Sequence, residues 1–250
     1  MLKGKTAFIT GTNRGIGKAL VEEFAKNGAD VIAHARRETP EFLSFCAEVA
    51  SAHGVSVRPV FFDMTDIPKM KDAVRSLISS KVPVHILVNN AGVAHSGLFQ
   101  MTPIDKIKEV FEVNLFSNMA LTQQLLRYIV KCGGGSILNV ASVSGIDILV
   151  GNCAYGVSKA ALIAFTKTLA AECGANGVRV NAIAPGATDT DMVNQMDEKA
   201  RNGKIQRCAM NRRGLPLEIA RTAVFLSSDN ASFVNGSILR VDGGGVTYDI

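Results

Sequence analysis

The chain has 250 residues, of which 47% are hydrophobic and 20% are charged, and a chain of this length buries a sizeable core as one large domain or two small ones. The net charge of +5 is dispersed, without the Lys/Arg runs typical of nucleic-acid binders. No apolar run approaches the roughly 20 residues of a membrane span, and a glycine-rich turn follows the N-terminus too early for a signal peptide. We therefore expect a cytoplasmic protein without nucleic-acid or membrane partners.

Cysteine and histidine usage argues against structural disulfides and bound metal. The five cysteines are scattered and lack a Cys-x-x-Cys pair, which suits free thiols in a reducing compartment. The four histidines form no cluster with ligand spacing, so we expect no metal site.

The sequence of residues 5–10, KTAFIT, indicates a short buried strand, and an amphipathic helix is predicted to follow to about residue 28. Glycines between a strand and a helix allow a tight turn and let the helix N-terminus face a pyrophosphate. The spacing here is Gly-x-x-x-Gly-x-Gly, so the general dinucleotide pattern is met approximately, and a glycine turn without a ligand is the alternative. The predicted cofactor contacts are Gly11, Asn13, Arg14, Gly15, Ile16 and Gly17.

The second predicted strand, 30–35, indicates which cofactor is bound. An acidic residue at its end would hold the ribose 2′-hydroxyl of NAD, but the strand ends in Ala35 and Arg36. Arg36, together with Arg14, is suited to a 2′-phosphate instead. We therefore predict NADP(H), with two solvated arginines as the alternative.

A helix over 40–53 and a strand over 56–62 are predicted next. Asp63, at the end of that strand, is placed to bond the adenine amino group, and Asp66 is predicted to cap the following helix. The fourth strand, 85–88, runs into a small, polar segment. A structural turn and a cofactor contact are equally good interpretations of that segment. Its predicted contacts are Asn90, Ala91 and Gly92.

A long helix is predicted over 103–131, with Asn114 among apolar neighbours. Such an asparagine usually satisfies nearby backbone, and the alternative is that it holds a water linking Lys159 to solvent. The fifth strand, 136–141, ends at Ser142, and the carboxyl ends of parallel strands are where ligands bind in open sheets.

Tyr155 and Lys159 are four residues apart on a predicted helix, so their side chains are neighbours. An ammonium about 4 Å from a phenolate, at an effective dielectric near 20, supplies about 4 kcal/mol, enough to bring the phenol towards neutral titration. Ser142 would hold a substrate oxygen while Tyr155 exchanges a proton with it, which suits interconversion of a carbonyl and an alcohol. A chance Tyr-x-x-x-Lys spacing is the alternative.

The sixth strand, 178–184, leads into a loop, and the polar, basic stretch over about 187–213 predicts a mobile substrate lid or, alternatively, a solvated helix. A helix over 216–227 and a seventh strand, 237–241, complete the pattern. Alternating strands and helices indicate one α/β domain over 1–250 with a parallel sheet.

With TGTNRGIG, NNAG, YGVSK and APGATDTDM in this order, the sequence resembles the short-chain dehydrogenase/reductase family over essentially its full length. The resemblance implies a Rossmann-type, doubly wound, seven-stranded parallel sheet with helices on both faces, and a homotetramer. It also implies a catalytic tetrad in which Tyr155 exchanges the proton, Ser142 orients the carbonyl, Lys159 lowers the tyrosine pKa and binds the nicotinamide ribose, and Asn114 supports a relay water. It also implies cofactor contacts from Tyr155, Lys159, Pro185, Gly186, Thr188 and Thr190, and a basic residue at Arg36 in NADP-preferring members.

Within the family, the chain looks most like the 3-oxoacyl-[acyl-carrier-protein] reductases, which implies NADPH-dependent reduction of a 3-oxoacyl thioester of acyl carrier protein or CoA, in fatty acid biosynthesis. The arginines that dock the carrier protein in bacterial reductases are not reproduced around Gly133 and Asn176. The alternative substrate is a sugar, a polyol or another small hydroxy or keto compound. A module that binds NADP(H) without catalysis is a further alternative, against which the intact tetrad argues.

Overall fold

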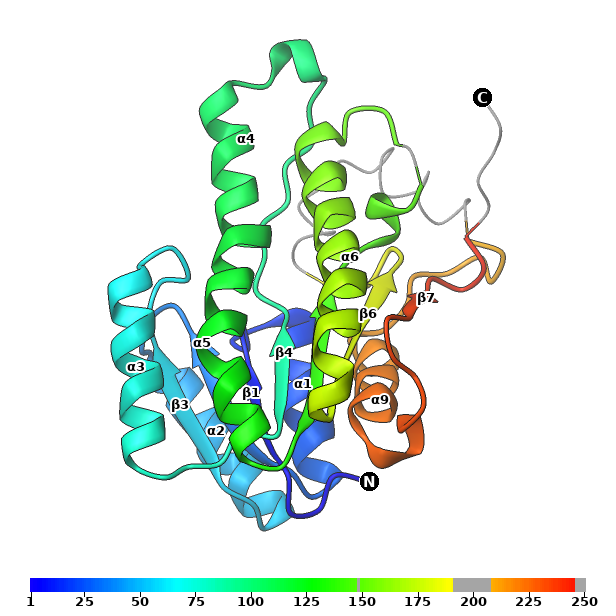
Figure 1. The fold of residues 1–250 in the computed structure, drawn as a ribbon. Coiled ribbons are helices and arrows are strands. Elements are labelled where there is room, and N and C mark those ends of the chain that lie inside the picture. Colours follow the sequence, from blue (N-terminus) through cyan, green and yellow to red (C-terminus); the bar gives the residue numbers. More distant parts are fainter. Residues whose placement is uncertain (148, 191–207, 246–250) are drawn as a thin grey trace.

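The computed structural model describes residues 1–147, 149–190 and 208–245. Its centre is a sheet of seven strands, all parallel, in the order β3-β2-β1-β4-β5-β6-β7 (Figure 1). This order confirms the predicted doubly wound Rossmann-type fold. The strands are β1 (Thr6–Ile9), β2 (Asp30–Ala35), β3 (Val57–Phe61), β4 (Ile86–Asn89), β5 (Gly135–Val140), β6 (Val178–Pro185) and β7 (Ile238–Val241).

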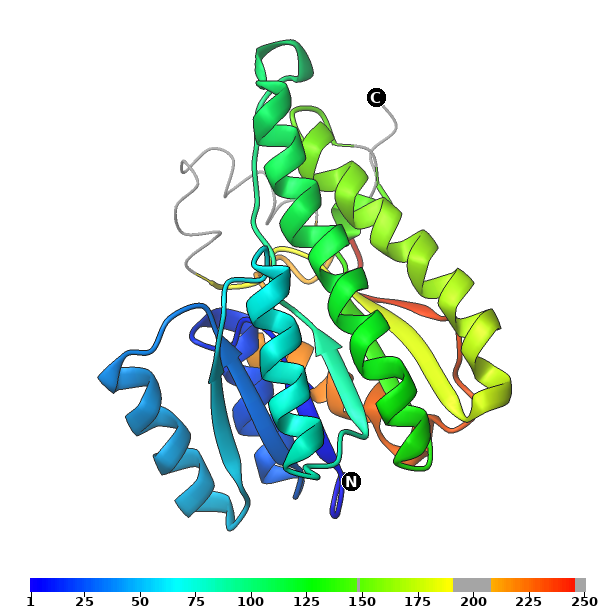
Figure 2. The same ribbon diagram turned by 60° about the vertical axis from the view of Figure 1, so that its left-hand side comes forward.

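Two helical layers cover the sheet, because successive side chains of a strand point to opposite faces. Ala7 and Ile9 of β1 pack into one hydrophobic cluster, whereas Phe8 packs into the other. Helices α1 (Gly15–Lys26), α2 (Pro40–His53) and α9 (Pro216–Ser227) cover the first face. The second face carries α3 (Ile67–Ser79), α5 (Ser117–Lys131) and α6 (Cys153–Cys173), which lie in front of the sheet in Figure 2.

Sequence order reverses direction across the sheet at the neighbouring strands β1 and β4. The glycine turn follows β1, and the Asn89–Gly92 segment begins at the end of β4. In parallel α/β sheets, ligands bind beyond the carboxyl ends of the strands at such a switch point. The fold therefore brings the two predicted cofactor segments to one crevice.

The helix predicted over 103–131 is continuous but not uniform. It consists of α4 (Ile104–Phe111), a π-helical turn (Glu112–Phe116) and α5. The Ser117 hydroxyl donates 2.7 Å to the Glu112 carbonyl, and the Asn118 amide donates 2.9 Å to the Asn114 carbonyl. These side chains bond carbonyls at the wide turn, and α4 packs beside the N-terminal part of α6.

Most of the predicted lid, 191–207, lies outside the described residues, so its motion stays a prediction. Both flanks of this stretch are anchored: Thr188 forms a bridge with Gly214, and Cys208 forms one with Gly245. Asp66 caps α3 through the Lys69 amide, as predicted. No helix in the described parts of the chain is long and apolar enough to cross a membrane.

Candidate active site

Ser142 lies two residues after the end of β5 and begins a short turn. Its Oγ accepts a hydrogen bond of 3.1 Å from the Ser144 amide, and its carbonyl accepts one of 3.0 Å from the Gly145 amide. Because these bonds fix the backbone, the buried hydroxyl is held at the carboxyl edge of the sheet. Its side chain lies close enough to Tyr155 of α6 to lower the pKa of that phenol.

Lys159 lies one helical turn after Tyr155 and is 4% exposed. Its Nζ donates a hydrogen bond of 2.8 Å to the Val140 carbonyl, next to Ser142, and lies 5.8 Å from the centre of the Tyr155 ring. Ser142, Tyr155 and Lys159 are thus brought together, as the sequence predicted.

The electrostatics differ from the expectation that Lys159 would lower the pKa of Tyr155. Burial raises the pKa of the Tyr155 phenol, and the Ser142 side chain only partly opposes this. Burial also lowers the pKa of Lys159 to about 8. The removal of both groups from water is therefore the largest influence on both pKa values.

Asn114 is fully buried in the π-helical turn. Its Oδ1 accepts from the Val93 amide at 2.8 Å, and its Nδ2 donates to the Val93 carbonyl at 2.9 Å and to Ser158 at 3.0 Å. The interpretation that it satisfies neighbouring backbone is confirmed, and its role with a relay water stays a prediction. A Cβ on Gly92 would lie 3.1 Å from Asn114 Oδ1 and 3.5 Å from Lys159 Nζ, so these three residues adjoin.

The glycine turn is compact in a way that side chains would prevent. Gly11 and Gly15 have positive φ angles of 69° and 55°. A Cβ on Gly17 would lie 1.9 Å from the Gly11 carbonyl oxygen and 2.7 Å from the Asn90 amide, and one on Gly15 would lie 3.3 Å from Thr190. The turn therefore meets both the β4 segment and the segment after β6, and it leaves backbone exposed to a ligand at the N-terminus of α1.

Thr10, which the sequence analysis did not single out, joins β1 to the β4 segment. Its Oγ1 accepts 2.9 Å hydrogen bonds from the amides of Asn90 and Ala91. The Asn90 side chain donates in return to the carbonyls of Thr10 and Gly11. Asn90 and Ala91 therefore have the structural role that one interpretation assigned to them, and they lie beside the glycine turn.

His34 was also missed, although a histidine in an otherwise apolar buried strand was the available signal. Its Nδ1 accepts from the Gly11 amide at 3.3 Å and its Nε2 lies 2.8 Å from the Phe62 carbonyl, which requires a proton on Nε2. Burial lowers the pKa of His34 to about 4. The neutral ring therefore holds the glycine turn to β3.

Arg36 is exposed at the end of β2, and its charge helps to lower the pKa of Asp63, although the Thr65 amide bonded to that carboxylate contributes most. These two predicted contacts therefore lie near each other at the end of β3. Asn13 and Arg14 are exposed in the glycine turn, whereas Ile16 packs against the core.

The segment after β6 lies next to the glycine turn, because Thr190 approaches Gly15. The Gly186 amide donates to the Val241 carbonyl at 3.0 Å, and a Cβ on Gly186 would lie 2.7 Å from Asp242. Thr188 is buried and donates 3.2 Å to the Gly186 carbonyl. Gly186, Thr188 and Thr190 therefore belong to one loop that follows Pro185, the last residue of β6, and reaches Gly15.

A known family matches this chain. The family model described as enoyl-(acyl carrier protein) reductase matches residues 11–246. A 3-oxoacyl-[acyl-carrier-protein] reductase from Thermotoga maritima is 38% identical over 97% of this chain and 98% of its own.

Two solved structures also superpose over nearly the whole chain. L-sorbose reductase from Gluconobacter frateurii, complexed with NADPH and L-sorbose, is 31% identical with a TM-score of 0.90, covering 99% of this chain and 98% of its own. A 7α-hydroxysteroid dehydrogenase complexed with NADH and 7-oxo glycochenodeoxycholic acid is 33% identical with a TM-score of 0.89, covering 98% and 95%. With the family match over the glycine turn, the tetrad residues and the sheet, the chain belongs to the short-chain dehydrogenase/reductase family, whose members are NAD(P)-binding oxidoreductases acting on CH–OH groups.

Proposed function

We propose that this protein reduces a 3-oxoacyl thioester, carried by acyl carrier protein or CoA, to the 3-hydroxyacyl thioester with NADPH. The observation that carries the proposal is the grouping of three side chains: Lys159 Nζ lies 5.8 Å from the centre of the Tyr155 ring, and Ser142 is close enough to Tyr155 to lower the pKa of its phenol. Similarity to 3-oxoacyl-[acyl-carrier-protein] reductases at 33–38% identity supports this substrate class.

The crevice fits a dinucleotide. The glycine turn presents backbone at the N-terminus of α1, which suits a pyrophosphate, and the exposed Arg36 suits a ribose 2′-phosphate. An ammonium has three N–H donors, of which Val140 takes one from Lys159, leaving donors for the nicotinamide ribose. When bound, NADPH supplies the hydride.

The protein's own residues handle the proton. Tyr155 donates its phenolic proton to the substrate oxygen, and Ser142 orients that oxygen. The Ser144 amide already bonds to the Ser142 oxygen, so the hydroxyl proton is directed away towards Tyr155 and the substrate. The ammonium of Lys159 then stabilises the phenolate left behind. Asn114 holds Val93 and so keeps the backbone beside Lys159 in place.

The substrate side of the site is apolar. The loop before α4 and the loop before α6 meet at a bridge between Gly97 and Asn152, and the Gly97 amide donates to the Gly151 carbonyl at 2.8 Å. Ile146 and Val150 of one loop and Leu98 of the other are exposed. Such a surface suits an acyl chain better than a sugar, because burying each methylene contributes about 0.8 kcal/mol.

The test is oxidation of NADPH, followed by absorbance, with acetoacetyl-CoA and an acetoacetyl-carrier protein side by side. Turnover with either substrate supports the proposal, and their ratio tells how far carrier docking proceeds without arginines at Gly133 and Asn176. Crotonyl-CoA is included because the matched family model is described as an enoyl reductase, and reduction of crotonyl-CoA alone would contradict the proposal.

A second candidate function is the reduction or oxidation of a sugar or polyol. The similarity of the chain to L-sorbose reductase supports this candidate. The same proton chemistry serves both candidates. No NADPH oxidation with either acetoacetyl thioester, together with NADPH-dependent turnover of L-sorbose or another keto sugar, would favour this second function. A homotetramer, which the family resemblance implied, is also a proposal, and sedimentation of the purified protein tests it.

A further inference from the structure

We propose that Arg240 is a positioning residue that locks the turn after the catalytic Ser142 to the two chain segments that flank residues 191–207. The inference rests on the proposed carbonyl reduction for its kinetic part only. Arg240 lies on β7 and is 93 residues from its partner Asp147 in sequence, so no local pattern connects the two.

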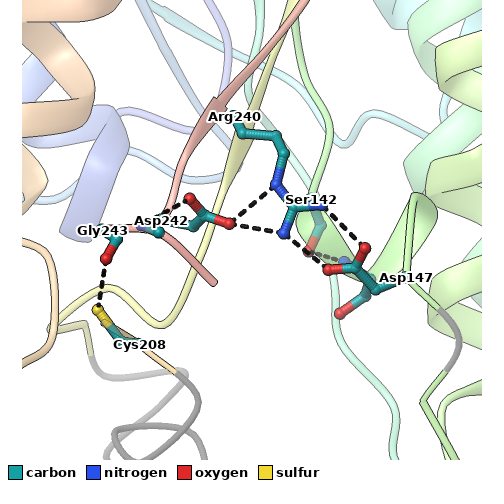
Figure 3. Close-up of polar contacts among 8 residues, drawn as sticks. Ser142, Asp147, Cys208, Arg240, Asp242 and Gly243 are labelled. Carbon is teal, nitrogen blue, oxygen red and sulfur yellow. Dashed lines mark hydrogen bonds and ion pairs between the residues drawn. The ribbon is translucent and has the colours of Figure 1, made fainter. Parts of the chain in front are cut away.

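The contacts of Arg240 are unusually complete. Its Nη1 and Nη2 each donate 2.8 Å hydrogen bonds to the two oxygens of Asp147, while its Nε and Nη2 donate to Asp242 at 2.9 and 2.7 Å. Figure 3 shows the two carboxylates pointing at the guanidinium from either side. Four hydrogen bonds, two of them in a fork, define the orientation as well as the distance. A lysine at this position cannot reproduce the fork.

One end of this cluster reaches the catalytic serine. Asp147 ends the turn that Ser142 begins, and its amide donates 2.8 Å to the Val143 carbonyl. That turn packs tightly on α6: a Cβ on Gly145 would lie 2.7 Å from the backbone of Lys159 and Ala160, and one on Gly156 would lie 2.7 Å from the Ser144 carbonyl. The Ser142 turn is therefore held between α6 and the Arg240–Asp147 ion pair.

The other end reaches the cofactor-side wall and the chain beyond residue 207. Asp242 packs closely against Gly186: a Cβ added to Gly186 would lie 2.7 Å from the Cβ of Asp242. Beyond Asp242, the carbonyls of Gly243 and Gly244 accept hydrogen bonds from the amides of Met210 and Ala209, each 3.1 Å. Cys208 Sγ also donates to the Gly243 carbonyl at 3.4 Å (Figure 3).

The lock thus joins three segments that come from distant parts of the sequence: the Ser142 turn, the loop at Gly186, and residues 208–210. Because four hydrogen bonds to two partly buried carboxylates fix the guanidinium in one orientation, we expect the Ser142 turn and both flanks of 191–207 to keep a fixed spacing. Arg240 itself touches neither the Tyr155 hydroxyl nor Lys159 in any contact of the described structure, so its role is to position.

Hydrogen–deuterium exchange of the full-length protein tests the lock without any substrate. In Arg240→Gln and Asp147→Asn, we expect faster exchange at Ile146 and Asp147 and also at Ala209 and Met210, with α1 and β1 unchanged. Arg75→Gln, which removes an arginine paired with Asp72 on α3, is the matched control and should change neither segment. Unchanged exchange at 208–210 in both lock variants would overturn the inference.

Kinetics with a substrate that the wild-type enzyme reduces provide the second readout. We expect kcat to fall about ten- to a hundredfold in Arg240→Gln, as small misplacements of catalytic groups do, with NADPH affinity within about twofold. The kcat of Arg240→Lys should lie between those of the wild-type enzyme and Arg240→Gln. The Lys variant replaces the Gln variant in the test if the latter does not fold. Wild-type inactivity on every acetoacetyl thioester would refute the proposed function and leave the exchange result to decide the lock. Normal kcat in the variants would overturn its link to Ser142.

Discussion

The ammonium of Lys159 donates a 2.8 Å hydrogen bond to the carbonyl oxygen of Val140, the residue two positions before Ser142. This contact places a buried cation directly beneath the catalytic edge of β5. Because the pKa of Lys159 is lowered to about 8, the cation becomes neutral as the pH rises through that value.

We therefore predict a basic limb near pH 8 in the pH profile of kcat/KM for carbonyl reduction, which reports groups of the free enzyme. Activity should fall above that pH, because the neutral amine no longer stabilises the Tyr155 phenolate. In Lys159→Arg, the residual activity should decline less at high pH, since a guanidinium stays charged. Identical limbs in the two proteins would exclude Lys159 as their source.

Replacing Tyr155 with Phe removes the proton donor and keeps the ring. We expect kcat to fall by about 10²- to 10⁴-fold, the usual contribution of a general acid, while NADPH affinity measured by fluorescence titration changes little. Tyr128→Phe on α5 is the matched control and should retain full activity. A Tyr155→Phe enzyme with near-normal turnover would rule out the proton donor assigned here.

Replacing Arg36 with Ala tests the cofactor preference. Hydrogen bonds to charged groups contribute about 1.5 to 3 kcal/mol each, so the ratio of kcat/KM for NADPH over NADH should drop by about tenfold or more. The neighbouring exposed Arg37→Ala should lower the ratio less. A wild-type enzyme that uses NADH as well as NADPH would refute the assignment of Arg14 and Arg36 to a 2′-phosphate.

His34 predicts a specific dependence of stability on pH. Its pKa of about 4 in the folded protein lies below the usual histidine value of 6.5, so the folded state binds fewer protons than the unfolded state between these two pH values. The contribution is complete above pH 6.5 and is lost as the pH falls towards 4. At pH 5 the wild-type protein should have lost about 2 kcal/mol of unfolding free energy through this residue.

Urea unfolding of His34→Gln at pH 7 and pH 5 measures that loss. The variant should be less stable at pH 7, because a flexible glutamine does not reproduce the two fixed contacts of the ring with Gly11 and Phe62, but its stability should fall less between the two pH values. His53→Gln changes an exposed histidine at the end of α2 and should reproduce the wild-type slope. Equal slopes in all three proteins would contradict the buried, neutral His34.

The fold could be predicted because its signals are local. Glycine turns, the four-residue spacing of Tyr155 and Lys159, and a serine after a buried strand each lie within a short segment, and parallel β/α order brings their ends together. The sequence therefore predicted that Ser142, Tyr155 and Lys159 lie together, and their catalytic roles stay a prediction.

Other features depend on contacts that no segment contains. Arg240 meets Asp147 only because β7 and the turn after β5 lie near each other in space, and His34 reaches both β1 and β3 from the strand between them. The pKa of Tyr155 was predicted in the wrong direction for the protein alone, because spacing gives the distance between charges but not the loss of water around them.

The π-helical turn at Glu112–Phe116 divides one long rod into two parts with different angular phase. Each residue of an α-helix advances by about 100°, so the extra residue in the wide turn sets α4 out of step with α5 by about that angle. Deleting any single residue between 112 and 116 would restore a regular helix and rotate α4 away from α6, while inserting one elsewhere would not compensate. We therefore expect the fold to tolerate most substitutions along this helix more easily than an insertion or a deletion of one residue.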